Sequence, residues 1–191
     1  MNLPNIHSTL LILMLSVMAA PLEKEQMIIT VDQMERQGAL FYFQNEPFTG
    51  NTIEFYSNGN VKSSGRFVNG SREGEQYTYH ENGQQASVRS YQDNNKHGKH
   101  LGWWPDGNQK FSYYFIDGLQ QGESMEWYED GELFREMNYK NGKEDGSQKM
   151  WEADGSIRAN YVVKNGKRYG LIGLKNCKSV NDEEGFTAIK Y

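Results

Sequence analysis

Residues 125–146 read MEWYEDGELFREMNYKNGKEDG. This stretch contains two turn signals separated by a run in which apolar and polar residues largely alternate. The first signal is Asp130-Gly131 and the second is Asn141-Gly142. Both pairs favour type I′ turns, because glycine accepts positive φ freely and Asn and Asp tolerate it better than most residues. Two such turns predict a β-hairpin whose second strand turns directly into the next hairpin.

The same pattern returns every 24 residues along most of the chain. Glycine recurs at this period in three series, which together contain 15 of the 20 glycines. The first series is Gly59, Gly83, Gly107, Gly131 and Gly155; the second is Gly50, Gly74, Gly98, Gly122, Gly146 and Gly170; the third is Gly70, Gly118, Gly142 and Gly166, with Asn94 in the missing slot. Asn or Asp precedes every glycine of the first and third series. We therefore expect structural turns at these glycines and an array of five hairpin repeats over residues 45–170.

Apolar side chains follow odd-numbered positions in both strands of each expected hairpin. The first strands carry Phe55, Tyr79, Trp103, Trp127 and Trp151, and the second strands carry Phe67, Tyr91, Phe115, Tyr139 and Val163. Since alternate residues of a strand share a face, we expect one aromatic face and one wetter face. The sequence thus predicts an all-β fold, an elongated single-layer antiparallel meander of tandem β-hairpin repeats.

Four further aromatic residues lie at even-numbered positions, on the expected wetter face: Tyr56, Trp104, Tyr114 and Tyr128. Exposed aromatic clusters often mark binding surfaces, so these four are the candidate binding residues. The aromatic residues at odd positions are instead expected to stabilise the sheet as cross-strand pairs.

An apolar run near the N-terminus, residues 10–20, reads LLILMLSVMAA. It is too short to span a bilayer, which takes about 20 residues. It has the length of a signal-peptide core and ends in small residues, so we expect residues 1–20 to be an export signal, cut after Ala19. Residues 1–9 lack the Lys or Arg that usually opens such a signal. The alternative is a buried apolar N-terminal segment.

The segments that flank the repeats are expected to cap them, because an open sheet edge invites pairing with other chains. Two apolar runs within residues 27–43 predict a capping hairpin, in residues 21–44, that forms the first edge. Residues 171–191 are expected to form a C-terminal cap with a last strand at 186–191. This tail holds Cys177, and a single cysteine excludes an intramolecular disulfide. A buried thiol is expected there, with intermolecular pairing or metal contact as alternatives.

The opening unit, NEPFTG at residues 45–50 followed by EFYSNGNVKSSGRFVNG at 54–70, resembles the bacterial MORN-variant repeats that are often named YwqK-family antitoxins. The stretch 125–146 shows the same resemblance, which extends over residues 38–170. The resemblance implies a β-hairpin array and functions in lipid contact, dimerisation and protein scaffolding. Expected export argues against neutralising a cytoplasmic toxin, and the acidic composition argues against a role on anionic lipid.

The net charge and the motif content argue against nucleic-acid binding, metal binding and catalysis. The net charge of −5 argues against a nucleic-acid-binding surface. The sequence contains no phosphate-binding loop, no HExxH and no G-x-S-x-G. His97 and His100 would face opposite sides of a strand, so joint metal binding is not expected. Carboxylates such as Asp106 and Asp130 are explained by turn chemistry. We expect no catalysis, no cofactor and no metal.

The favoured interpretation is an exported, non-catalytic protein-interaction scaffold in the bacterial envelope, periplasmic or extracellular, with an unidentified protein partner or a second copy of the chain. The first alternative is a cell-surface or glycan-binding module in contact with cell wall or membrane. Equivalent strands lie about 9–10 Å apart, near the length of a disaccharide, so exposed Trp104 and Tyr128 would favour sugar stacking. An antitoxin or immunity protein, and an enzyme with converging carboxylates, are the remaining alternatives.

Overall fold

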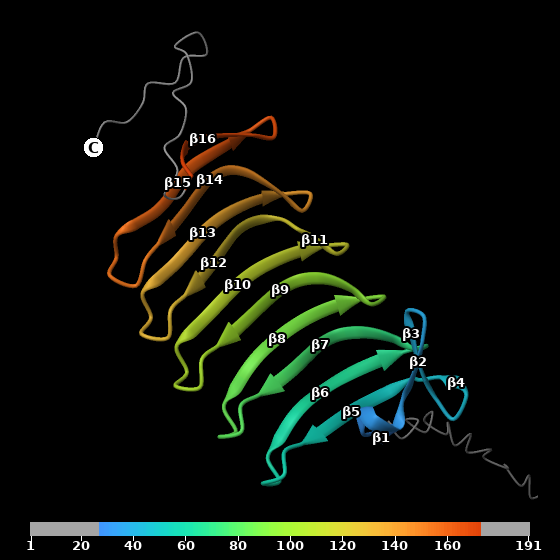
Figure 1. Ribbon diagram of the computed structural model, residues 1–191. Coiled ribbons are helices and arrows are strands. Elements are labelled where there is room, and N and C mark those ends of the chain that lie inside the picture. Colours follow the sequence, from blue (N-terminus) through green and yellow to red (C-terminus); the bar gives the residue numbers. More distant parts are fainter. Residues whose placement is uncertain (1–26, 173–191) are drawn as a thin grey trace, which may run out of the picture.

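The computed structural model describes residues 27–172, which form one long β-sheet with a small second sheet at one end (Figure 1). The long sheet has 13 strands. Eleven of them are hairpin strands in chain order: β5 (Gly50–Phe55), β6 (Val61–Val68), β7 (Ser71–Tyr79), β8 (Gln85–Gln92), β9 (Asn95–Trp103), β10 (Gln109–Ile116), β12 (Gly122–Trp127), β13 (Leu133–Lys140), β14 (Lys143–Trp151), β15 (Ile157–Lys164) and β16 (Lys167–Leu171). The short β11 (Leu119–Gln120) pairs with β10, and β1 (Ile28–Ile29) pairs in parallel with β5.

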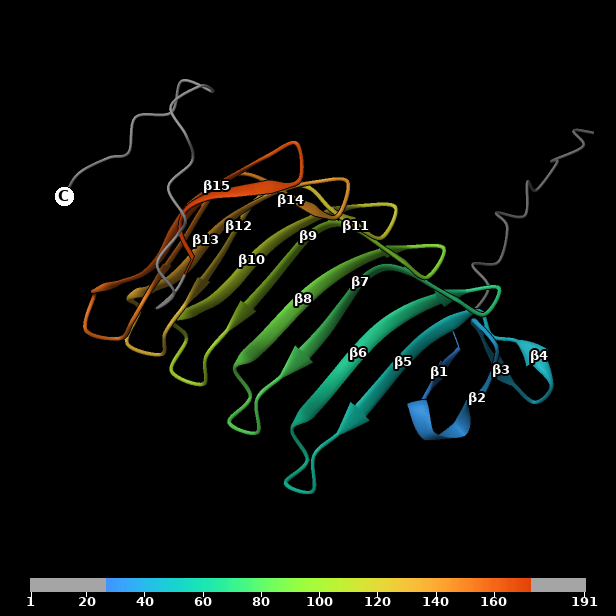
Figure 2. The ribbon, with the colours of Figure 1, turned by 45° about the horizontal axis from the view of Figure 1, so that its top comes forward.

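The predicted all-β, single-layer antiparallel meander is confirmed. Each hairpin strand from β5 onward pairs antiparallel with the next hairpin strand. The strands bend along their length while the sheet twists from end to end (Figure 2). Between residues 27 and 172 the helical content is one short 3-10 turn, η1 (Val31–Gln33). No helix in that range is long and apolar enough to cross a membrane.

The two series of Asn-Gly and Asp-Gly pairs form different turns. At Asn69-Gly70 both residues have positive φ, +48° and +79°, as a type I′ turn requires. At Asn58-Gly59 only the glycine does, with φ +87°, so the predicted type I′ turn is wrong for that series. The reason is local hydrogen bonding: the Asn58 side chain accepts from the backbone N–H of Asn60 at 2.9 Å, which stabilises an Asx turn instead.

A large bulge interrupts the pairing between β6 and β7, where one hairpin meets the next. Gly65 pairs with Gln76 and Phe67 pairs with Arg72, so two steps along β6 lie opposite four steps along β7. Gly74 lies in the middle of the longer segment and has φ +72°. Corresponding shifts occur between β8 and β9 and between β13 and β14. Gly74, Gly98 and Gly146 of the second glycine series therefore mark bulges, which bend the strands.

The two columns of aromatic residues lie on opposite faces of the sheet, so the predicted single aromatic face is wrong. Val68 pairs with Ser71 across the two-residue turn, which places an even-numbered residue opposite an odd-numbered one on the same face. One face, here called the groove face, carries the second-strand residues Phe67, Tyr91, Phe115, Tyr139 and Val163 together with the first-strand residues Thr52, Gln76, His100, Ser124 and Gln148. Most buried side chains of the long sheet belong to this face.

The opposite face carries the first-strand aromatic column. It contains Phe55, Tyr79, Trp103, Trp127 and Trp151, and the most exposed of these rings is Phe55, at 53%. The strand pleat therefore gives each face its own set of aromatic side chains.

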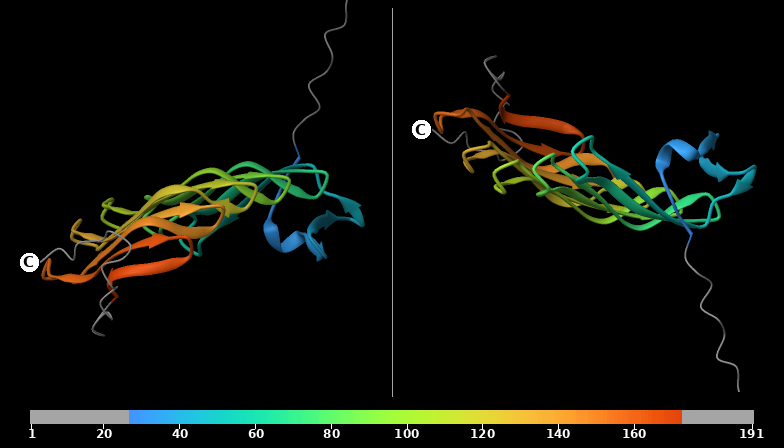
Figure 3. Two further views of the ribbon diagram at one scale, coloured as in Figure 1. Left: turned by 90° about the horizontal axis from the view of Figure 1, so that it is seen from above. Right: turned by 90° about the horizontal axis from the view of Figure 1, so that it is seen from below.

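The small sheet lies to one side of the N-terminal end of the long sheet (Figure 3). It consists of β2 (Glu35–Gln37), β3 (Leu40–Phe43) and β4 (Glu46–Pro47), with β2 and β3 paired antiparallel. A hairpin thus forms within the predicted segment, but β1 rather than this hairpin occupies the edge of the long sheet. The Phe41 ring packs at 5.1 Å from the buried Phe67 ring, so the small sheet covers the groove face at this end.

Several predictions from the sequence fall outside the described residues. They concern the export signal at residues 1–20, cleavage after Ala19, the environment of Cys177 and a last strand at residues 186–191.

Candidate functional site

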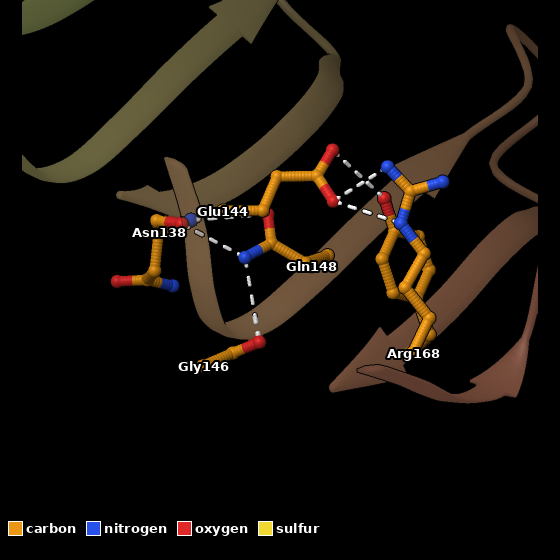
Figure 4. Close-up of polar contacts among 6 residues, drawn as sticks. Asn138, Glu144, Gly146, Gln148 and Arg168 are labelled. Atoms are coloured by element: carbon orange, nitrogen blue, oxygen red, sulfur yellow. Dashed lines mark hydrogen bonds and ion pairs between the residues drawn. The ribbon is translucent and has the colours of Figure 1, made fainter. Parts of the chain in front are cut away.

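The bulges leave backbone groups without a strand partner, and polar side chains of the groove face satisfy them. Gln148 is fully buried and shows the arrangement most completely (Figure 4). Its Nε2 donates to the carbonyl oxygen of Asn138 at 2.8 Å and to that of Gly146 at 3.3 Å. Its Oε1 accepts from the Asn138 backbone N–H at 3.2 Å. One side-chain amide thus replaces the missing ladder bonds, because buried backbone groups need partners.

Two earlier repeats use the same device. The Nε2 of Gln76 donates to the carbonyl oxygen of Arg66 at 2.9 Å. The Nε2 of His100 lies 2.8 Å from the carbonyl oxygen of Ser90. His100 is 2% exposed, and this burial lowers its pKa below the ordinary value, while the hydrogen bond to Ser90 acts in the other direction. His100 is therefore a neutral structural donor at the centre of the groove face.

A pocket of about 390 Å³, here called the groove, hollows this face between β8 and β13. Aromatic rings of β10 line its floor. The rings of Phe111 and Tyr113 stack at 4.8 Å, and the Phe115 ring meets Tyr113 edge-on at 6.4 Å. Tyr139 of β13 lines the far wall. The groove therefore offers flat aromatic surface along two strands.

The Phe111 ring lies directly over Gly102 of the neighbouring strand. A Cβ atom at Gly102 would lie 2.1 Å from Cε1 of Phe111, far inside van der Waals contact. Gly102 has ordinary negative φ, so the glycine serves close packing here and not backbone conformation. Phe111 can pack at the floor of the groove only because position 102 has no side chain.

The groove contains one carboxylate, and protein groups already bind it. Arg135 and the Tyr113 hydroxyl both contact Oε1 of Glu126, as an ion pair and a hydrogen bond. Burial raises the pKa of Tyr113 well above its ordinary value, and the hydrogen bond to Glu126 raises it further. Tyr113 therefore remains a neutral phenol, and Glu126 has no second carboxylate in the groove lining with which to act as an acid–base pair.

Toward the N-terminal end of the groove face, three cations rest on aromatic rings. The Arg89 guanidinium lies 5.6 Å from the centre of the Phe111 ring, and Lys96 Nζ lies 4.8 Å from that of Phe115. Arg72 lies 4.9 Å from the Phe41 ring. Within residues 27–172, none of the three forms an ion pair with a carboxylate.

Three of the four predicted binding residues contribute to an interaction between repeats. A side chain just after each of the first strands β5, β7, β9 and β12 hydrogen-bonds the backbone carbonyl 23 residues further on. These pairs are Tyr56 with Tyr79 (2.8 Å), His80 with Trp103 (2.9 Å), Trp104 with Trp127 (3.2 Å) and Tyr128 with Trp151 (3.0 Å). Trp104 and Tyr128 are half-buried. Tyr114, the fourth, is 41% exposed and lies on the opposite face. The structure does not bring the four together.

Sequence reasoning missed the groove residues Phe111, Tyr113, Arg89 and Lys96 as a site. It assigned second-strand aromatic residues to structural pairing alone. The signal that would have found them is the two-residue turn, which joins residues of opposite parity and so places even first-strand positions beside odd second-strand positions. No group of three or more His, Cys, Asp or Glu side chains suited to a metal ion occurs within the part of the chain that the structure covers.

The MORN repeat variant family matches residues 48–69, 72–93 and 120–141, each of which spans one hairpin. The chain contains MORN repeat variants. The MORN segments start at positions that differ by multiples of 24, and residues 96–117 and 144–165 continue the same hairpin pattern. MORN repeats are typically non-catalytic binding modules. No curated protein was found that matches the chain.

Proposed function

We propose that this chain is an exported, non-catalytic MORN repeat scaffold of the bacterial envelope that binds a segment of a protein partner along its groove face. The observation that carries the proposal is the groove itself, an aromatic-lined hollow of about 390 Å³. Aromatic side chains and arginine are the residues that dominate protein interfaces. The apolar run at residues 10–20 supports export.

Several features favour binding over catalysis. The groove lining contains Glu126 as its one carboxylate, and Arg135 and Tyr113 occupy it. His100 lines the groove but is buried, and its Nε2 is bound to the backbone carbonyl of Ser90. A rigid sheet with fixed aromatic rings suits recognition, because little conformational entropy is lost when a ligand docks.

The arrangement of Trp104 and Tyr128 favours a protein ligand over a polysaccharide. The glycan interpretation needs these two rings as an exposed stacking surface. Both rings are half-buried, and their polar atoms hydrogen-bond the carbonyl groups of Trp127 and Trp151 in the next repeat. The aromatic surface of the groove is instead flanked by cations, which suits a charged protein segment.

The test is photo-crosslinking in the native host with the full chain. A photoreactive residue replaces Gln120, which lines the groove, or Tyr114, which lies on the opposite face of the adjoining strand β10. We expect one protein adduct from the Gln120 position and none from the Tyr114 position. An adduct of twice the chain mass identifies a second copy as the partner. Adducts only from the Tyr114 position would overturn the groove as the binding surface.

Export is tested in the same cells. Fractionation and mass spectrometry should find the protein outside the cytoplasm without residues 1–19. An uncut chain in the cytoplasm would contradict the envelope assignment and leave the antitoxin alternative.

A further inference from the structure

We infer that the groove selects an extended acidic peptide segment that also carries an aromatic side chain, with its carboxylates toward β7–β9 and its aromatic group toward β10–β13. This inference rests on the proposed function and adds the chemistry and orientation of the ligand.

The cations of the groove face differ in whether a carboxylate neutralises them. Toward the C-terminal end, Arg135 pairs with Glu126, and Arg168 Nη2 lies 2.8 Å from Glu144 (Figure 4). These pairs leave that half of the face close to neutral. Toward the N-terminal end, no described carboxylate pairs with Arg72, Arg89 or Lys96. The face therefore carries positive charge at one end within a protein of net charge −5.

Aromatic rings hold the unneutralised cations in place. Arg72 lies between two rings, 4.9 Å from that of Phe41 and 5.5 Å from that of Tyr91. Lys96, which is exposed, lies over Phe115. A ring attracts a cation through its electron-rich face but accepts few of its N–H donors, so these groups remain able to bind an anion. Positions fixed before binding also reduce the entropic cost of recognition.

The spacing of these cations suggests a ligand geometry. Arg72 and Lys96 occupy equivalent positions in successive repeats, on β7 and β9, with β8 between them. Their backbones therefore lie about 9–10 Å apart. A polyproline II segment rises about 9.3 Å in one three-residue turn, so carboxylates three residues apart on one side would match the two cations. The next turn would bring an aromatic side chain to the Gln120 position, beside Phe115 of the groove lining.

The repeats supply replacements that the fold already accepts. Gln120 takes the place of Lys96 in the next repeat, and Met137 takes the place of Arg89 two repeats later. The variant Lys96→Gln plus Arg89→Met therefore removes two groove charges with residues that fit equivalent positions. Arg66→Gln, on the opposite face of β6, is the matched control for loss of charge.

The experiment measures binding of fluorescent synthetic peptides to the purified protein by anisotropy. The probe is EPPEPPFPPF, and its comparison peptides carry Lys or Gln in place of Glu, or Ala in place of Phe. We expect the Glu probe to bind at least tenfold more tightly than the Lys probe. The double variant should weaken the Glu probe at least tenfold, while Arg66→Gln leaves it unchanged. Equal affinity of the Glu and Lys probes, which needs no protein variant, would overturn the inference.

Further arms separate this inference from the proposed function. Lys96→Gln should reduce discrimination between Glu and Gln probes, whereas Tyr139→Ala should reduce discrimination between Phe and Ala probes. If the Gln120 position gives crosslinks but the protein shows no preference for acidic probes, the inferred ligand chemistry is wrong and the scaffold proposal is retained. Stronger charge-dependent binding to phosphatidylglycerol vesicles or to a thymidine oligonucleotide would replace the peptide with a lipid or a nucleic acid.

Discussion

The Nε2 atom of His100 lies 2.8 Å from the carbonyl oxygen of Ser90, and the Nε2 atom of Gln148 lies at the same distance from that of Asn138. An imidazole and an amide thus perform one structural role, two repeats apart. The bulge decides which backbone group lacks a partner, and the residue two positions after the bulge glycine supplies the donor.

Replacing His100 by glutamine should therefore preserve stability, because Gln76 and Gln148 already fill this role in other repeats. Replacing it by alanine should cost about 1–3 kcal/mol, since the Ser90 carbonyl would lose its donor inside the sheet. Urea unfolding followed by circular dichroism measures both variants. Equal losses from His100→Gln and His100→Ala would show that ring packing, not the hydrogen bond, decides the position.

The same residue should make stability depend on pH. Burial lowers the pKa of His100, so the unfolded chain binds a proton more readily than the folded one. The stability contribution is complete above the ordinary histidine pKa of about 6.5 and is lost as pH falls from there through the lowered value. The midpoint of thermal unfolding should drop on acidification across this window, and less so for His100→Gln. Parallel curves for the two proteins would contradict the assignment.

Gly102→Ala should destabilise the protein by about 1–3 kcal/mol, because the new methyl group would displace the Phe111 ring. The matched background is Phe111→Ala, in which the ring is absent. In that background Gly102→Ala should destabilise the protein less than it does in the wild-type chain, and a double-mutant cycle measures the difference. If the losses of stability from Gly102→Ala and Phe111→Ala simply add, the backbone conformation at Gly102, and not packing against Phe111, requires the glycine.

Turn chemistry made the architecture predictable from the sequence. Asn69-Gly70 reports backbone conformation directly, since few residue pairs accept positive φ twice. A 24-residue period of such pairs leaves little freedom in the topology. The form of the turn at Asn58-Gly59 was not predictable from that pair alone, because the side chain of Asn58 competes for the backbone N–H of Asn60.

The groove was harder to predict because it depends on register. Phe111 and Arg89 meet only when β8, β9 and β10 are aligned, and the bulge at Gly98 shifts that alignment. The hydrogen bond of Trp104 was not predicted for a related reason. Its position just beyond a strand, and not the parity of its number, decides that Nε1 reaches the Trp127 carbonyl of the next repeat.

Tyr128→Phe should cost about 0.5–1.5 kcal/mol, because it removes the hydrogen bond from its hydroxyl to the Trp151 carbonyl and leaves the ring in place. Tyr114→Phe, an exposed residue of the opposite face, is the control and should change stability little. Urea unfolding measures both. A full-length Tyr128→Phe protein with unchanged stability but weaker partner binding would return Tyr128 to the list of recognition residues.

Asn94→Gly should destabilise the protein, although glycine occupies the equivalent slot of the neighbouring repeats. Asn94 already adopts φ +65°, so the change relieves the backbone. It also removes the Nδ2 bonds to the Ala39 carbonyl, at 2.9 Å, and to the Ser71 hydroxyl, at 3.1 Å, and the 2.8 Å bond that Oδ1 accepts from the Arg72 N–H. These bonds connect the small sheet to the repeats.

We expect a loss of about 1–3 kcal/mol for Asn94→Gly, with faster hydrogen exchange in β2 and β3 than in β13. The converse change, Gly118→Asn, keeps positive φ in the next hairpin and should have a small effect, because Asn tolerates that conformation. Uniform exchange across the sheet after Asn94→Gly would mean that the small sheet does not depend on this residue. Selective exchange there would identify Asn94 as the residue that exchanges a turn glycine for a connection between the two sheets.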